Sequence, residues 1–226
     1  MENPEQTGRI AELEADNARL RRLLDRLGAP AELRHRLRST MAMLRKMIRR
    51  TAETERDFAS YVGHLEERMD ALMRAQAVAD ERGCINLHDL LADELLHYCI
   101  AEDDRAVLSG PDVELRPRAG QVLAIAVHEL AINAVEHGCL GIATGRVQVT
   151  WMVSMQGSSA LLTLDWKELG GSNMPRLRSP GFGSEVLNKM LAYELKAQTN
   201  TGFEVDGFRC TISFPLHEQI GRWVAG

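Results

Sequence analysis

The sequence feature that most constrains the fold is the segment 119–137, an apolar run interrupted by polar residues at regular intervals. Glu129, Asn133 and His137 recur every fourth residue, and most residues between them are apolar. A spacing of four places side chains one turn apart on the same side of an α-helix. We therefore expect a buried helix with one polar edge. Burying an amide and a carboxylate along such an edge is unfavourable unless they meet water, a metal ion or a ligand.

The residues around this helix predict an α/β sandwich. Gly138 stands where the C-terminus of a helix favours glycine. The expected elements are, in order, a short helix at 88–98, a strand-like stretch at 106–115, the helix at 119–137, strands at 146–154 and 160–168 joined across Gly157, a helix at 184–195, and strands at 202–205 and 208–215. Helices packed on one face of a mixed sheet form such a sandwich.

The N-terminal residues carry a heptad pattern. The apolar and amide positions alternate in steps of three and four: Ile10, Leu13, Asn17, Leu20, Leu24 and Leu27. This spacing is typical of a coiled-coil seam, and an Asn at an a position favours a parallel, in-register dimer. The alternative is a single amphipathic helix packed against its own chain. Gly28 and Pro30 end the pattern, since Gly ends helices and Pro suits the first turn of the next.

Two further helices are expected at 31–50 and 58–79, joined by a polar turn, and they predict an antiparallel helical hairpin. Two such hairpins would pair as a dimeric four-helix bundle. The expected fold is therefore α+β, with a coiled-coil leader at 1–30, a dimerisation hairpin at 31–80 and an α/β sandwich at 81–226. These boundaries follow the change in composition after Gly83.

The net charge of −5 hides an uneven distribution. Residues 34–50 hold seven Lys and Arg and no acid, whereas residues 51–80 hold seven acids and three arginines. Either the two segments are faces of paired helices that attract each other, or the basic segment meets an anionic partner. Nucleic acid is disfavoured as that partner, because the acids counter the positive field and no aromatic or DNA-reading motif accompanies the arginines.

Several classes of protein are disfavoured by what the sequence lacks. No apolar run approaches the roughly 20 residues of a membrane span, and the first residues show no secretory signal. The four cysteines are scattered, as in reduced cytosolic chains. His128-Glu129 is not followed by the second histidine of a zinc protease motif, and no phosphate-binding GxxxxGK occurs. We expect a cytoplasmic protein without a membrane segment.

Four segments contain residues suited to nucleotide chemistry. The Asn133 carbonyl is an oxygen ligand of the kind Mg²⁺ accepts. Glu168 is followed by the glycine pair Gly170-Gly171, which permits close backbone approach. Gly181-Phe-Gly183 opens a helix, where free amides attract phosphate. His35 carries an imidazole that is largely neutral near pH 7. Each segment taken alone is equally compatible with an ordinary structural role.

Taken together and in this order, the four segments resemble the HWE-type sensor histidine kinases of two-component systems. Glu32-Leu-Arg-His35 resembles the H-box of that family and His128-Glu-Leu-Ala-Ile-Asn133 its N-box. Trp166-Lys-Glu168 resembles the Trp-x-Glu signature, and the Gly181–Gly183 segment resembles the G-box. The resemblance covers roughly residues 31–216. It implies that the C-terminal sandwich is a Bergerat-type ATP-binding domain.

The resemblance also implies roles for individual residues. His35 would be the phosphorylated residue, with Glu32 as its orienting partner. Asn133 would hold Mg²⁺, and Glu168 would accept a hydrogen bond from the adenine amino group. The remaining residues that it assigns to ATP are Glu129 and His137 at the phosphates, Gly170 beside the base, and Gly181 and Gly183 in the lid.

The implied function is ATP-dependent autophosphorylation of His35, followed by transfer to an aspartate on a response-regulator receiver domain. The cofactors would be ATP and Mg²⁺, and the working form a parallel homodimer. Input would come from a separate sensor protein or an upstream sensor domain. The alternative is a histidine phosphotransferase or pseudokinase scaffold of the same fold. Retention of Asn133 and Gly183 argues against that alternative.

Overall fold

The computed structural model describes residues 15–16, 18–19, 22, 40–42, 44–45, 47–49, 58–98, 105–157, 159–170 and 182–223. The chain divides into two compact units, Met1–Met69 and Asp70–Gly226. The described residues before 50 are all helical. The heptad positions lie outside the described residues, so the coiled coil and the dimeric bundle stay predictions. No helix in the described segments has the length and apolar character needed to cross a bilayer.

Helix α3 (Phe58–Arg82) confirms the helix expected at 58–79 and extends it by one turn. It ends at Gly83, whose φ of +74° places it in the left-handed region. The Gly83 N–H donates to the Ala79 carbonyl at 2.9 Å. A glycine in this conformation closes a helix without the steric strain that a Cβ would introduce.

The larger of two sheets in Asp70–Gly226 has the strand order β2-β4-β5-β7-β6. Its strands are β2 (Ala106–Ser109), β4 (Arg146–Gln156), β5 (Ser159–Leu169), β6 (Gln198–Glu204) and β7 (Gly207–Leu216). Strand β2 pairs in parallel with β4, and the other pairs are antiparallel. The sheet is therefore mixed, as expected. Gly157 turns β4 into β5 with a φ of +63°.

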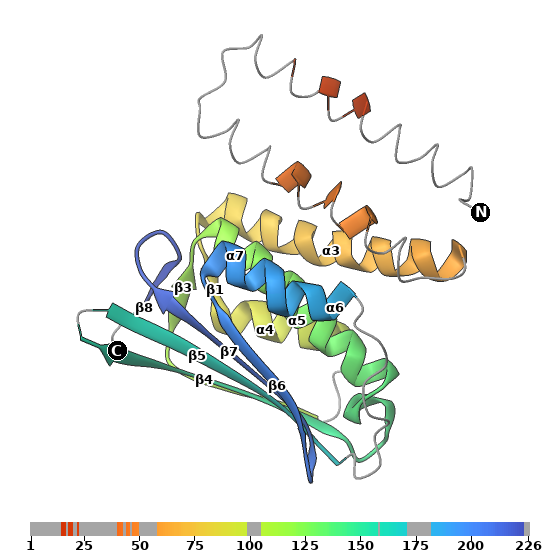
Figure 1. The fold of residues 1–226 in the computed structure, drawn as a ribbon, viewed down its shortest axis with the longest axis vertical. Coiled ribbons are helices and arrows are strands. Elements are labelled where there is room, and N and C mark those ends of the chain that lie inside the picture. Colours follow the sequence, from red (N-terminus) through yellow and green to blue (C-terminus); the bar gives the residue numbers. More distant parts are fainter. Residues whose placement is uncertain are drawn as a thin grey trace. The chain divides into compact units, whose positions relative to one another are not determined.

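Helices cover one face of this sheet (Figure 1). They are α4 (Leu87–Tyr98), α5 (Pro117–Glu136), α6 (Phe182–Glu185) and α7 (Leu191–Leu195). The strands turn alternate side chains toward them, because successive residues of a strand face opposite sides. The buried side chains on β5 are Leu162, Leu164, Trp166 and Glu168, and those on β7 are Cys210, Ile212, Phe214 and Leu216. The predicted sandwich is confirmed in this arrangement.

Besides the strand expected at 202–205, which is β6 and begins at Gln198, two sequence expectations were wrong in detail. The stretch 106–115 is two strands, β2 and β3 (Val113–Leu115), which belong to different sheets. Gly110 separates them, and a Cβ there would clash with the Trp151 ring. Strand β3 pairs with β1 (Ile85–Asn86) and β8 (Gly221–Trp223), two strands too short to give a periodic signal.

The second correction concerns the helix expected at 184–195. A π-helical turn, Val186–Met190, separates α6 from α7. Such turns occur mostly as short interruptions of α-helices and are frequent near functional sites.

Candidate functional site

Six of the nine residues that the sequence assigns to the site lie within the described part of the chain. They are Glu129, Asn133, His137, Glu168, Gly170 and Gly183. The other three, Glu32, His35 and Gly181, lie outside it. The described six come from α5, from the end of β5 and from the start of α6.

Helix α5 carries the expected polar edge. Pro117 occupies its first turn, where a missing N–H removes no intrahelical bond. Glu129 is buried, with 3% of its surface exposed, whereas Asn133 and His137 are exposed. The His137 N–H caps the helix on the Asn133 carbonyl at 2.9 Å. The polar edge therefore runs from the protein interior to the surface.

Gly183 lies directly against this edge. A Cβ built on Gly183 would stand 3.0 Å from the Glu129 Oε2 and 3.3 Å from the Asn133 Nδ2. The fold thus brings two segments fifty residues apart into contact, with only a hydrogen atom of glycine between them. Any larger residue would fill the space beside these oxygens and amides. The Glu129 carboxylate and the Asn133 amide carry oxygens of the kind that a magnesium ion accepts, so the donor set fits a divalent ion.

Glu168 forms the other end of the candidate site. It is buried at the end of β5, with 2% of its surface exposed. The Cys139 N–H donates to its Oε2 at 3.0 Å, and the Trp166 indole N–H donates to Oε1 at 3.4 Å. Burial raises the pKa of Glu168, and these hydrogen bonds oppose the rise. A buried carboxylate held by N–H donors is suited to accept a hydrogen bond from a ligand.

Gly138, which follows α5, lies close to the Glu168 carboxylate, and the sequence did not reveal this contact. It follows the helix as expected, but its φ of −119° is not left-handed. A Cβ at this position would clash with the Glu168 Oε2. Glycine is therefore required by the close approach of the carboxylate and of the Ala134 backbone, and not by a left-handed cap. Gly170, with a φ of +99°, does need glycine for its backbone conformation.

Arg105 is a further residue that sequence reasoning missed. Its guanidinium donates to the carbonyl oxygens of Gly145 at 3.0 Å, Leu140 at 2.8 Å and Ile142 at 2.7 Å. These bonds hold the segment 139–145, which supplies the Cys139 N–H to Glu168. Burial, with the neighbouring Glu168 carboxylate, raises the pKa of the Cys139 thiol to about 12, so the thiol adds no charge to the site.

His137 occupies a different environment from the other five residues. It is the capping residue of α5, its side chain is half exposed, and its Nε2 lies 3.5 Å from a carboxylate oxygen of Glu136. Its expected place beside the phosphates stays a prediction.

The fold has a counterpart among solved structures. The structure matches the histidine kinase domain of the Erythrobacter litoralis blue-light activated histidine kinase with a TM-score of 0.51 at 20% identity, covering 94% of this chain and 96% of that one. At this identity the match establishes a histidine-kinase-like fold alone.

The sequence comparisons then place the chain in a family. Residues 32–112 match the family model described as HWE histidine kinase. Blue-light-activated histidine kinase 1 of Erythrobacter litoralis is 33% identical over 195 residues, which are 83% of this chain and 53% of that protein. The corresponding kinase of Rhizobium johnstonii is 29% identical over 209 residues, 92% of this chain and 56% of the relative. The chain belongs to the HWE histidine kinase family, and it spans about half the length of these curated relatives.

Proposed function

We propose that this chain is an ATP-dependent protein histidine kinase that phosphorylates His35 and passes the phosphoryl group to an aspartate of a response-regulator receiver domain. The observation that carries the proposal is the contact of Gly183 with Glu129 and Asn133 on α5. The buried Glu168 adjoins the end of the same helix. Helix α5 thus separates the proposed phosphate-binding end, at Glu129 and Asn133, from the proposed base-binding end, at Glu168.

Each end suits one part of ATP. The Glu168 carboxylate accepts a hydrogen bond from the adenine amino group, and the Gly170 backbone lets the base approach closely. Asn133 would supply an oxygen to Mg²⁺, and the bound ion would neutralise charge on the phosphates. Glu129 Oε2 and Asn133 Nδ2 both lie close to Gly183, whose lack of a side chain leaves room for the phosphates. This arrangement supplies positioning and charge neutralisation, the two things that phosphoryl transfer chiefly requires.

The transfer uses the H-box. A neutral ring nitrogen of His35 attacks the γ-phosphorus, a P–N bond forms, and the bond from that phosphorus to the bridging oxygen of ADP breaks. Glu32, three residues earlier, orients the imidazole. The phosphoryl group then passes from His35 to a carboxylate oxygen of the receiver aspartate. We propose a parallel homodimer in the cytoplasm as the working form.

Incubation with γ-labelled ATP tests the chemistry. We expect label on the wild-type chain and none on His35→Ala. A wild-type chain that binds Mg-ATP without acquiring label would contradict the kinase. A chain that neither binds nor labels would favour the phosphotransferase or pseudokinase scaffold.

Calorimetric titration with Mg-ATP tests the site. Asn133→Ala should weaken binding at least about tenfold, equivalent to about 1.4 kcal/mol. Asn200→Ala is the matched control, because Asn200 is an exposed asparagine on β6. Gly183→Ala should also weaken binding, whereas Gly202→Ala should not, since a Cβ at Gly202 meets nothing within 4 Å. Equal Mg-ATP affinities for Asn133→Ala and Asn200→Ala would contradict the proposed role of Asn133 in an ion site.

A further inference from the structure

A buried polar network lies behind the N-box helix, on residues to which the proposed mechanism gives no role. It is centred on His128 and Glu94, whose surfaces are 1% and 2% exposed. From the sequence, His128 received no role in the site: it served to set aside a zinc protease motif and to mark the family resemblance. The network involves three helices, α3, α4 and α5, and every residue in it belongs to the unit Asp70–Gly226.

The contacts form a chain from α3 to α5. The Arg74 guanidinium on α3 donates to Glu94 Oε1 on α4 at 2.7 Å and to Asp93 at 3.0 Å. The second oxygen of Glu94, Oε2, lies 3.5 Å from the Nδ1 of His128 on α5. The same Nδ1 is 3.0 Å from the Tyr98 hydroxyl at the end of α4. One imidazole nitrogen therefore faces both a carboxylate and a phenol.

The contacts among Arg74, Glu94 and His128 lie in the interior, where losing one costs more free energy than it would at the surface. Burial lowers the pKa of Arg74, but the Glu94 and Asp93 carboxylates outweigh it and raise the pKa overall, so Arg74 stays charged. Within the described part of the chain, Glu94 Oε2 and His128 Nε2 are buried without a hydrogen-bond partner. Each residue keeps a contact through its other polar atom, Glu94 Oε1 to Arg74 and His128 Nδ1 to Tyr98, and losing that contact as well would be costly in the interior. Only a narrow range of positions of α5 keeps Nδ1 within reach of both Glu94 and Tyr98.

We propose that His128 is a positioning residue for the kinase site: through Nδ1 it ties α5 to the Arg74–Glu94 pair and so sets where Glu129 and Asn133 stand. This inference rests on the proposed ATP site. Helix α5 moves as one body, because its backbone is hydrogen-bonded throughout. Glu129 is the next residue, and Asn133 lies on the following turn. A rotation or shift of α5 that breaks the Nδ1 contacts therefore displaces both side chains from Gly183.

A second ion pair between α3 and α4 provides a matched control. Arg82 NH1 lies 3.2 Å from Asp89 Oδ2, and both side chains are well over half exposed. Neither residue belongs to the chain of contacts that reaches α5. Removing Arg82 takes away a cation and an α3–α4 contact of the same chemical type, but leaves His128 and its partners in place.

Two substitutions of His128 separate positioning from packing. His128→Phe keeps the ring volume and removes both nitrogens. His128→Asn is smaller, but its amide can occupy the place of Nδ1 and contact Tyr98 and Glu94. We expect His128→Phe to weaken Mg-ATP binding at least about tenfold, and His128→Asn to recover most of the affinity although it lowers the melting temperature. Affinities that simply follow the melting temperatures would overturn the proposal.

A double-mutant cycle tests the chain of contacts in the full-length protein. Arg74→Met and His128→Phe should be non-additive in their effect on Mg-ATP affinity, because each breaks the same chain. Arg82→Met and His128→Phe should be additive. If His128→Phe does not fold, the near-isosteric Glu94→Gln takes its place in both cycles.

The results separate two kinds of failure. Additive effects in the Arg74 cycle, with a wild type that binds Mg-ATP, would overturn the role of His128 and leave the kinase proposal standing. A wild type that shows no Mg-ATP binding would overturn the proposed function, and the positioning role with it.

Discussion

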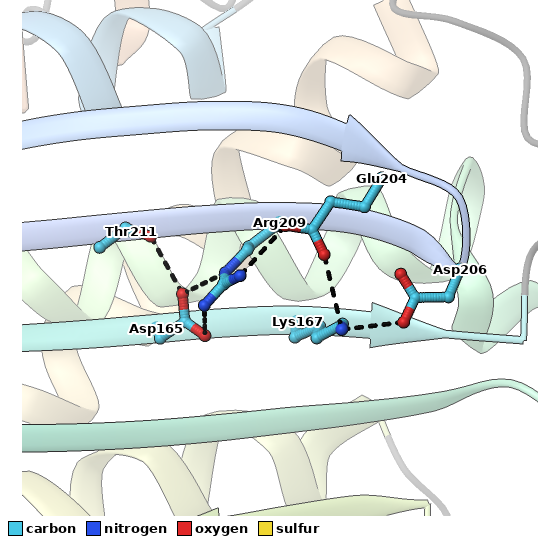
Figure 2. Close-up of polar contacts among 6 residues, drawn as sticks. All are labelled: Asp165, Lys167, Glu204, Asp206, Arg209 and Thr211. Atoms are coloured by element: carbon cyan, nitrogen blue, oxygen red, sulfur yellow. Dashed lines mark hydrogen bonds and ion pairs between the residues drawn. The ribbon is translucent and has the colours of Figure 1, made fainter.

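Side chains of the same kinds lie in different environments on the two faces of the five-stranded sheet. Along β5, Trp166 and Glu168 face the helices and are buried, while Asp165 and Lys167 face the other way. Figure 2 shows the open-face group, in which the acids Asp165, Glu204 and Asp206 alternate with the cations Lys167 and Arg209. Asp165 and Glu168 are three residues apart on β5. The first carboxylate therefore lies on the open face, whereas the second is buried against the helices.

Within the open-face group each charge has an opposite charge beside it. Arg209 donates to both oxygens of Asp165, at 2.7 and 3.0 Å, and Lys167 Nζ lies 2.8 Å from Asp206 Oδ2. The Lys167 contact lowers the pKa of Asp206 and the Asp206 contact raises the pKa of Lys167. Exposed ion pairs of this kind stabilise a fold little, because water and salt compete with them.

On the covered face Glu168 has N–H donors and no cation among its hydrogen-bond partners, and burial raises its pKa. A carboxylate held in this way is buried, and both of its oxygens accept from N–H groups of the protein. The covered face therefore holds both the packed apolar side chains and a carboxylate suited to bind a ligand. The charges of the open face pair with one another and keep that surface soluble. Perturbed carboxylates of the first kind are the ones to suspect of function.

The largest expected effect is the loss of packing on the covered face. Trp166→Ala removes a fully buried indole and should lower the free energy of unfolding by about 3–5 kcal/mol. Urea denaturation measures this loss. Thr163→Ala, on the opposite face of the same strand, should change it far less. Equal losses at the two positions would break the contrast between the faces.

The next effect concerns the backbone beside Glu168. Gly207 has a φ of +152°, and a Cβ there would clash with the Glu168 carbonyl oxygen. Gly207→Ala should therefore cost about 1–3 kcal/mol, seen as a lower melting temperature. Gly202→Ala, at an open position on the neighbouring strand, serves as the control. A wild-type melting temperature for Gly207→Ala would show that the hairpin can move away from β5.

The pH dependence of stability should have opposite signs on the two faces. The folded-state pKa of Glu168 is raised from 4.5, so its contribution is present below pH 4.5 and is lost as the pH rises through the raised value. The stability of wild type relative to Glu168→Gln should therefore fall with rising pH. The pKa of Asp206 is lowered from 3.8, so wild type relative to Asp206→Asn should lose stability as the pH falls below 3.8. Parallel pH profiles for the two comparisons would contradict this difference.

The smallest effect is expected in the open-face group. Arg209→Gln removes the cation shared by Asp165 and Glu204. Its melting temperature should differ slightly from wild type at low salt and not at all in high salt, because the Debye length shrinks to about 3 Å at 1 M. A large, salt-insensitive shift would mean that the open face is covered by another element in the working protein.

Much of the sandwich was predictable because its signals are local. The four-residue spacing of Glu129 and Asn133 predicted their shared edge of α5, and the two strand-like stretches on either side of Gly157 predicted β4 and β5. The short strands β1 and β8 were not predictable, since two or three residues carry no period. The break at Gly110 was missed for a related reason: it depends on the ring of Trp151, forty residues away.

The sequence by itself determined the order of the H-box, N-box, Trp-x-Glu and G-box motifs, the polar edge of α5 and the family to which the chain belongs. Each of these depends on residues that are close together in the sequence. Only the tertiary structure decided that Gly183 touches Glu129 and Asn133, that Gly138 makes room for Glu168, and that Arg105 and the Arg74–Glu94–His128 chain hold the surrounding helices and loop. These are contacts between residues distant in sequence, and burial and close approach exist only once the chain has folded around them.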